Sequence, residues 1–233
     1  MATLIQAICG DDVVARLSAM VTVTRADAPA VPYLCKFLLE RARPWSVRWS
    51  ITSALARIGE DSCVPALLAV VGENRAPGDE WIRYGAVQAL GRFRPPEAVP
   101  ALVELLSDTV TPKDFWPENR ICDVAVAALS RIETREARAA VAAWRQWHRA
   151  KLREEDPAIR LTAAIALAFA GDGAGRAVLL EYMRSGPLKR NPALRGFDTT
   201  QVEKALEVLR DAPIPEPLDE GGGSEQSGGA AMN

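Results

Sequence analysis

The chain of 233 residues is 48% hydrophobic and 25% charged, with a formal net charge of −2. This composition supplies enough apolar side chains for a packed core and excludes a wholly disordered chain. A protein that binds nucleic acid over a large surface usually carries an excess of basic residues, so the charge disfavours that class. No apolar run approaches the roughly 18 residues of a membrane-spanning helix. The N-terminal residues MATLIQAICGDD lack the basic start of a signal peptide, so the sequence predicts a cytoplasmic protein.

A repeated pattern organises the chain. Residues 47–71 read VRWSITSALARIGEDSCVPALLAVV, and residues 82–106 read IRYGAVQALGRFRPPEAVPALVELL. Two further copies begin at Ile121 and Ile159, so the period is about 37 residues, which is typical of helical repeat proteins. An Ala-Leu pair stands in register in the four copies, at Ala54-Leu55, Ala89-Leu90, Ala128-Leu129 and Ala166-Leu167.

Each copy predicts two helices joined by a short turn. In the first copy the apolar residues recur at the spacing of one helix face, at Val47, Ile51, Ala54, Leu55 and Ile58. Turn residues follow in each copy, at Gly59, Arg94-Pro95-Pro96, Glu133-Thr134 and Gly171-Asp172-Gly173. A second apolar stripe then begins, and Pro65 and Pro100 fall in its first turn, where the missing N–H costs no hydrogen bond.

Such helix pairs cannot cover their own apolar flanks, so they must stack on neighbouring pairs as a solenoid. The sequence therefore predicts an all-α superhelix of about five helix pairs over residues 1–210. The pairs are expected near residues 12–42, 46–72, 81–107, 120–150 and 158–184, with a closing helix at 199–210. Residues 211–233 are rich in Pro and acidic residues and then in Gly and Ser, and this composition predicts a disordered tail.

The pattern VR…A…AL…VPAL…LL, clearest at residues 47–71 and 82–106, resembles HEAT repeats of the short bacterial type named after the phycobilisome lyases. The resemblance covers residues 12–184. It implies an armadillo-like α-solenoid and leaves the activity open, because similar proteins include protein scaffolds, bilin-lyase subunits, a di-iron hydroxylase of deoxyhypusine and distant DNA-repair proteins.

The sequence offers little for catalysis. It contains one histidine, His148, whereas the similar di-iron hydroxylase needs several His-Glu pairs, so the resemblance does not extend to that site. A single histidine also gives no legible Ser-His-Asp or Cys-His arrangement. The four cysteines lie far apart with no C-x-x-C pair, which predicts reduced thiols and no zinc site: Cys9, Cys35, Cys63 and Cys122. We therefore predict no catalytic residue, no cofactor and no metal, and expect His148 on a packing face of a helix.

Three arginines, Arg48, Arg83 and Arg160, share the second position of their copies. The dipole at a helix start disfavours a cation, so a compensating group is expected. Two interpretations remain open at this point. The resemblance implies a ladder in which acids join these arginines to neighbouring repeats, with candidates Glu60, Asp61, Asp79, Glu80 and Asp156. Alternatively, the arginines bind an anionic partner.

Aromatic residues accompany these arginines. Trp49 and Tyr84 each follow one of them directly. Aromatic residues mixed with arginines either form a patch that recognises a partner or pack between adjacent repeats and hold them together. Phe115 and Trp116 lie in the longest insertion, residues 107–119, where they either anchor a partner or fold back over their own repeat. The candidate partner-binding residues are Arg48, Trp49, Arg83, Tyr84, Phe115, Trp116 and Arg160.

The sequence thus favours a non-catalytic scaffold or adaptor that binds another protein or a peptide on a curved helical surface. One alternative is a bilin-lyase-like or chaperone-type subunit acting on a partner protein, which rests on the resemblance alone. Another alternative, a nucleic-acid-binding HEAT-like protein, would need a basic concave face and is disfavoured by the net charge of −2.

Overall fold

The computed structural model describes residues 28–73, 79–110, 120–184 and 199–210, together with Ala7, Ile8, Ala19, Thr22, Leu194 and Phe197. All regular structure in these ranges is helical, so the predicted all-α fold is confirmed. The first helix expected in the pair at 12–42, the insertion residues Phe115 and Trp116, and the tail at 211–233 lie outside the described residues.

The helices follow one another as short antiparallel pairs. The first described helix is α3 (Val31–Leu39), and the pairs after it are α4 (Trp45–Ile58) with α5 (Val64–Val71), α6 (Asp79–Phe93) with α7 (Val99–Glu104), α8 (Ile121–Leu129) with α9 (Arg135–Lys151), and α10 (Pro157–Phe169) with α11 (Arg176–Arg184). The closing helix α12 covers Thr199–Val208. Short 3-10 turns lie at Ala28–Ala30, Asp61–Cys63, Pro96–Ala98, Leu105–Ser107 and Gly173–Gly175.

Local sequence signals set the ends of these helices. Gly59 ends α4 in the left-handed conformation, with a φ of 82° that glycine adopts without a Cβ clash, and its N–H donates to the Leu55 carbonyl. Pro65 and Pro100 lie in the first turns of α5 and α7. The side chain of Thr134 accepts from the Ala137 N–H at the start of α9. The turn residues read from the sequence therefore mark the observed boundaries.

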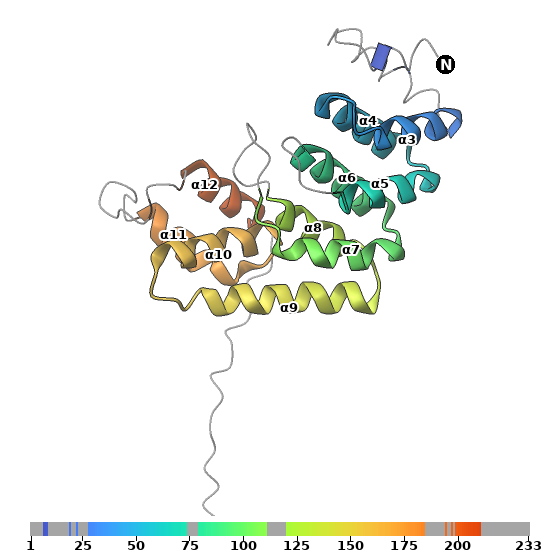
Figure 1. The fold of residues 1–233 in the computed structure, drawn as a ribbon. Helices are drawn as coiled ribbons and strands as arrows, with labels where there is room; N and C mark the ends of the chain where they lie inside the picture. The colour runs from blue at the N-terminus through green and yellow to red at the C-terminus, as the bar shows by residue number, and fades with distance from the viewer. Residues whose placement is uncertain are drawn as a thin grey trace, which may run out of the picture.

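The pairs stack in chain order, and one helix spans two of them (Figure 1). The first helices α4, α6 and α8 pack successively against one another, and α3 packs against both α4 and α5. The long helix α9, yellow in Figure 1, runs along α7 and α8 with one part and along α10 with the other. Helix α12 covers α10 and α11. Helix α9 is therefore the element that links the two halves of the stack.

Small residues let the first helices of neighbouring pairs approach closely. A Cβ placed on Gly85 of α6 would lie 2.6 Å from the Thr52 Oγ1 of α4. A Cβ placed on Gly91 would lie 2.9 Å from the Cβ of Ala128 on α8. Both separations are below the contact distance of real side chains, so glycine is required at these two positions for the observed spacing.

The apolar interior consists of two main clusters. The larger one takes side chains from α3 through the start of α9, including Leu34, Ile51 and Leu90. The smaller one lies among α10, α11 and α12, around Leu161 and Leu179. A third cluster joins the two regions with four buried residues, Val126, Trp144, Ala166 and Leu167. The junction between the clusters thus lies where α8, α9 and α10 meet.

Candidate interaction surfaces

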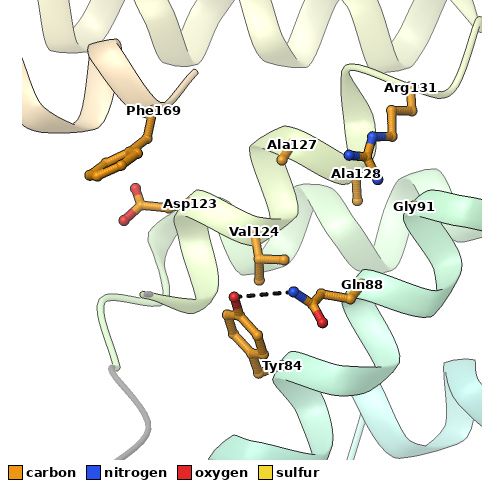
Figure 2. Close-up of a pocket in the computed structure, with 9 residues that line it drawn as sticks. All are labelled: Tyr84, Gln88, Gly91, Asp123, Val124, Ala127, Ala128, Arg131 and Phe169. Carbon is orange, nitrogen blue, oxygen red and sulfur yellow. Dashed lines mark hydrogen bonds between the residues drawn. The ribbon is translucent and has the colours of Figure 1, made fainter. Parts of the chain in front are cut away.

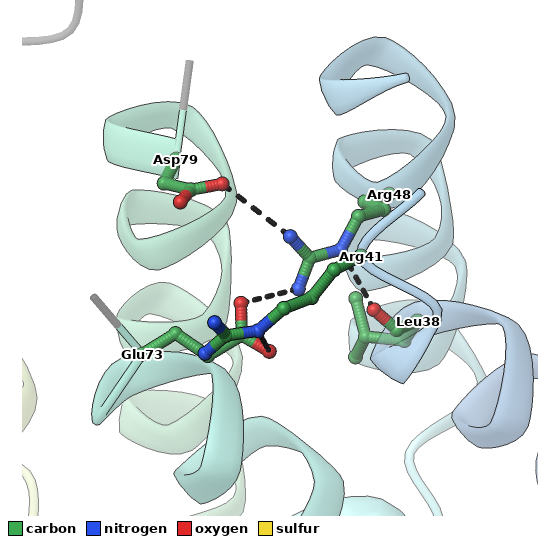
Figure 3. Close-up of polar contacts among 5 residues, drawn as sticks. All are labelled: Leu38, Arg41, Arg48, Glu73 and Asp79. Atoms are coloured by element: carbon green, nitrogen blue, oxygen red, sulfur yellow. Dashed lines mark hydrogen bonds and ion pairs between the residues drawn. The ribbon is translucent and has the colours of Figure 1, made fainter. Parts of the chain in front are cut away.

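Arg48 is enclosed within the stack (Figure 3). Its side chain is 3% exposed. The guanidinium Nε donates to the Leu38 carbonyl over 2.8 Å, Nη2 meets Glu73 at 2.6 Å and Nη1 meets Asp79 at 3.3 Å. One side chain thereby ties the end of α3 to the end of α5 and the start of α6. Of its acidic partners, Asp79 was among the predicted candidates and Glu73 was not.

Arg83 occupies the equivalent position one repeat later. Its Nη1 lies 2.8 Å from Asp108 Oδ2, in a pair whose side chains are 3% and 0% exposed. Asp108 also accepts from the Val110 N–H through Oδ1, and its carbonyl accepts from the Cys122 N–H at 2.9 Å. The pair therefore lies where Asp108 and Val110, after the end of α7, contact the start of α8. For Arg48 and Arg83, the structure shows the ladder that the sequence left as one of two interpretations.

Arg160 does not continue this ladder in the same way. Its Nη1 donates to the backbone carbonyls of Glu154 and Glu155, each over 3.0 Å. Both acceptors lie in the turn just before α10, so the bonds are local and do not reach a neighbouring repeat. Asp156, a predicted acid partner, instead accepts from the Ala158 N–H and begins α10. The positive end of that helix is thus compensated by Asp156 as its N-cap.

The aromatic residues near these arginines pack mainly between α4 and α6. Trp45 stacks on Trp81 with ring centroids 5.9 Å apart, and Trp49 meets Trp81 edge-on at 6.2 Å. Trp45 is nevertheless 46% exposed. Tyr84 is buried, and its hydroxyl accepts from Gln88 Nε2 over 3.2 Å. Of these aromatic residues, Trp45 presents the most open surface.

A small pocket opens where α6, α8 and the end of α10 meet (Figure 2). It has a volume of about 220 Å³, below the range of about 300–1,000 Å³ that holds typical small ligands. Its acid, Asp123, is already held by Arg120 through two hydrogen bonds of 2.8 and 2.9 Å. Tyr84 and Gln88, one turn apart on α6, are hydrogen-bonded to each other on one side of it. Neither its size nor its polar groups favour a ligand.

A larger hollow, which we call the α9 groove, has a volume of about 890 Å³. Its lining comes from three helix pairs and the turn between two of them: Val103, Leu106, Ser107, Thr109, Arg120, Cys122, Ala140, Ala143, Trp144, Trp147, His148, Lys151, Ala158, Ile159, Thr162 and Ala163. Three of these side chains are large, apolar and open to solvent, with Trp147 59% exposed, Ile159 39% and Val103 38%. Exposed apolar side chains gathered in one hollow are typical of an interaction site.

Of the candidate residues that the structure describes (Arg48, Trp49, Arg83, Tyr84 and Arg160), none lines this groove. The residue that could have indicated the groove from the sequence is Trp147. It does not belong to the buried face of α9, which includes Val141, Trp144 and His148. Its ring contacts His148 edge-on, with centroids 4.7 Å apart, yet more than half of the side chain stays exposed on the outer face of an otherwise polar and alanine-rich helix. That position therefore indicates a contact outside the helix pair.

The charged side chains that line the groove are cations. Arg120 pairs with Asp123, and Lys151 pairs with Glu154 at 2.8 Å. Lys151 Nζ also lies 5.6 Å from the centre of the Trp147 ring. The carboxylates of both pairs stand outside the lining, and among the described lining residues there is no Asp or Glu. The open surface of the groove is thus apolar with a cationic margin.

Cys122 and His148, which also line the groove, do not form a nucleophile and base. Burial raises the pKa of the Cys122 thiol to about 12, so the thiol stays protonated at neutral pH, whereas a reactive cysteine must be a thiolate. Burial lowers the pKa of His148, whose Nδ1 lies 3.0 Å from the Trp144 carbonyl. Its ring lies 3.8 Å from that of Trp144, centroid to centroid. His148 is on a packing face, as the sequence predicts, and is neutral at pH 7.

Folding stability is expected to depend on the protonation of His148. Because burial holds its folded pKa below the usual 6.5, the unfolded chain binds the proton more readily. The stability linked to neutral His148 is therefore complete above pH 6.5 and declines as the pH falls below it, by at most about 1.4 kcal/mol at pH 5.5. Urea unfolding at pH 8.0 and 5.5 should show a smaller loss for His148→Gln than for the unaltered chain. An identical loss in both proteins contradicts this assignment.

The described residues also bear on metal binding, on the state of the cysteines and on membrane insertion. Among the residues that the structure describes, no group of three or more His, Cys, Asp or Glu side chains is placed to hold a metal ion. Cys35, Cys63 and Cys122 carry free thiols. In the same ranges no helix has both the length and the apolar character needed to cross a membrane.

Comparison with known proteins identifies the repeat. Residues 31–113 match the family model of HEAT repeats. No curated protein matches the chain. Similar solved structures include a chain of the complex of CpcE and CpcF of phycocyanin lyase from Nostoc sp. PCC7120, with 16% identity, a TM-score of 0.43, and coverage of 88% of this chain and 93% of that one.

Two other similar structures are human deoxyhypusine hydroxylase and YibA of Escherichia coli. The human enzyme has 17% identity and a TM-score of 0.40, over 89% of this chain and 95% of that one. YibA has 15% identity and a TM-score of 0.45, over 90% and 92%.

Proposed function

Because residues 31–113 are HEAT repeats, we propose that this helical scaffold is a non-catalytic interaction protein that holds a segment of another protein in the α9 groove. The observation that carries the proposal is the exposure of Trp147 in an apolar hollow of about 890 Å³. Tryptophan side chains in such positions commonly contribute a large part of the binding free energy of an interface.

The construction of the groove supports binding rather than chemistry. Its walls are helices held by two buried clusters, so the surface exists before a partner arrives and little ordering opposes association. Its cysteine is protonated and its histidine is neutral and bonded to the backbone. The arginines Arg48 and Arg83 stabilise the stack from within, and the proposed partner contacts lie instead at Trp147, Val103 and Ile159.

The test is loss of the partner when Trp147 is replaced. We expect Trp147→Ala to reduce capture of the partner from native extract at least tenfold, because the largest exposed apolar side chain of the groove is removed. The matched control is Trp45→Ala, which removes a tryptophan that is 46% exposed at a distant site and should leave capture unchanged. Quantitative mass spectrometry of both eluates measures the difference. Equal loss with both variants, or none with either, overturns the proposal.

Site-specific crosslinking locates the contact. A photo-reactive residue at Val103 should crosslink the captured partner, and the same residue at Leu180 should not, because the two positions are 38% and 37% exposed and only Val103 lines the groove. If the eluate instead contains a coloured small molecule that Trp147→Ala removes, the bilin-lyase-like alternative replaces the scaffold proposal.

A further inference from the structure

Resting on the proposed function, we propose that the occupant of the α9 groove is an amphipathic helix whose apolar stripe is flanked by carboxylates. The dimensions of the groove are the first argument. Helix α9 lines it with residues at positions i, i+3, i+4, i+7, i+8 and i+11, from Ala140 to Lys151. At 1.5 Å per residue this stripe is about 16 Å long, or three turns of helix. A partner helix with apolar residues at i, i+4, i+7 and i+11 covers the same length.

The chemistry of the lining favours a helix over an extended peptide. An extended segment needs acceptors and donors for its own backbone, and in the described ranges the fold has no strand whose edge could supply them. The lining is mostly Ala, Val, Leu, Ile and Trp side chains. Backbone N–H and C=O groups buried against such side chains would remain unpaired at a cost in free energy. A helix satisfies these groups internally and can lie directly against an apolar wall.

The positive charges of the lining favour a partner with negatively charged residues. Arg120 and Lys151 are the charged residues among the described lining positions. The pair of Lys151 with Glu154 is exposed, at 32% and 43%, and such pairs are weak. Lys151 can therefore exchange Glu154 for a carboxylate of the partner.

The same charges disfavour a second copy of this chain as the occupant. In a two-fold dimer the groove would face its own image. Lys151 and Arg120 would then approach the equivalent cations of the other copy, and the described lining residues include no carboxylate that could pair with them across the interface. A different partner that carries acidic residues removes this repulsion.

The inference is tested by fluorescence anisotropy with designed peptides of about 15 residues. One peptide carries leucines along a single helical stripe with flanking glutamates, the second carries lysines in place of the glutamates, and the third carries the glutamates with a central proline that breaks the helix. We expect the first peptide to bind at least tenfold more tightly than either of the others. The whole chain has a net charge of −2, so non-specific electrostatic attraction would favour the lysine peptide. Tighter binding of the glutamate peptide would therefore indicate binding at the cationic margin of the groove.

Two variants at the margin sharpen the test. Lys151→Glu should abolish the preference for the glutamate peptide. Glu154→Gln should tighten binding of that peptide several-fold, because Lys151 loses its internal partner. Equal affinity for the glutamate and lysine peptides, or for the helical and proline-broken peptides, overturns the inference. If no peptide binds while the Val103 crosslink to a partner still depends on Trp147, the scaffold proposal stands and the helical occupant is wrong.

Discussion

Replacing Arg83 by Ala is expected to lower the free energy of unfolding by about 3–5 kcal/mol. The guanidinium is 3% exposed and the side chain of its partner Asp108 is 0% exposed, so the substitution removes a buried positive charge from beside a buried carboxylate. Asp108 also accepts hydrogen bonds from the Val110 N–H, after α7, and from the Cys122 N–H at the start of α8. Chemical denaturation followed by circular dichroism measures the loss.

A double substitution separates the buried charge from the packing of the side chain. Arg83→Met with Asp108→Asn removes both charges, retains an amide oxygen for Val110, and should recover more than half of the stability lost in Arg83→Ala. The exposed Arg57, in the last turn of α4, gives a control, because Arg57→Ala should change stability by less than about 1 kcal/mol. A loss at Arg83 no larger than the loss at Arg57 contradicts the buried-pair argument.

The substitution Leu90→Ala is expected to cost about 2–5 kcal/mol, since a fully buried leucine leaves both lost apolar contacts and a cavity. Leu90 is 0% exposed and belongs to the larger apolar cluster. Leu90 lies directly before Gly91, where the backbones of α6 and α8 are in close contact. These two helices therefore have little freedom to move into the space that the leucine leaves. The cavity should therefore collapse little, which places the expected cost in the upper part of this range.

The matched control for this second experiment is Leu180→Ala. Leu180 lies on α11 and is 37% exposed, so its truncation should cost less than about 1 kcal/mol. Thermal or urea unfolding of both variants gives the comparison. A cost at Leu90 within error of that at Leu180 would show that Leu90 does not support the junction of the repeats.

Most of the fold follows from local sequence signals. The apolar spacing of Val47, Ile51 and Leu55 depends only on the helical period, and Gly59 and Pro65 mark a helix end and a helix start by their own backbone preferences. These signals act over fewer than about ten residues and do not depend on the rest of the chain. The helix pairs could therefore be predicted with their order and approximate bounds.

The arginine ladder was predictable only in part. The position of Arg48 at a helix start shows that a compensating acid is needed, and Asp79 was among the expected acids. Glu73 and Asp108 were not, because each lies about 25 residues beyond its arginine, after the second helix of the pair. Only the stacking of one repeat on the next brings these residues together, and no local pattern encodes that distance.

The α9 groove could not be predicted from the repeat pattern. It depends on where side chains are small, at Ala140 and Ala143, and on the convergence of α7, α9 and α10 from three successive pairs. The repeat alignment directed attention to positions that recur, such as Arg48 and Arg83, and these hold the architecture together. Trp147 does not recur in the other copies, so a search for shared positions passes over it.

The division of the interior has a consequence for how the molecule opens. Two separate apolar clusters joined by four residues form two units that can unfold locally with different free energies. Leu106 and Ala140 of the groove pack on the larger cluster, whereas Ala158 packs on the smaller one. A ligand in the groove therefore bridges both units, and separating them requires its release. With a partner bound, amide hydrogens in the two halves should exchange at similar rates, because the halves unfold together. The rate at which their junction opens then sets the upper limit on how long the partner stays bound.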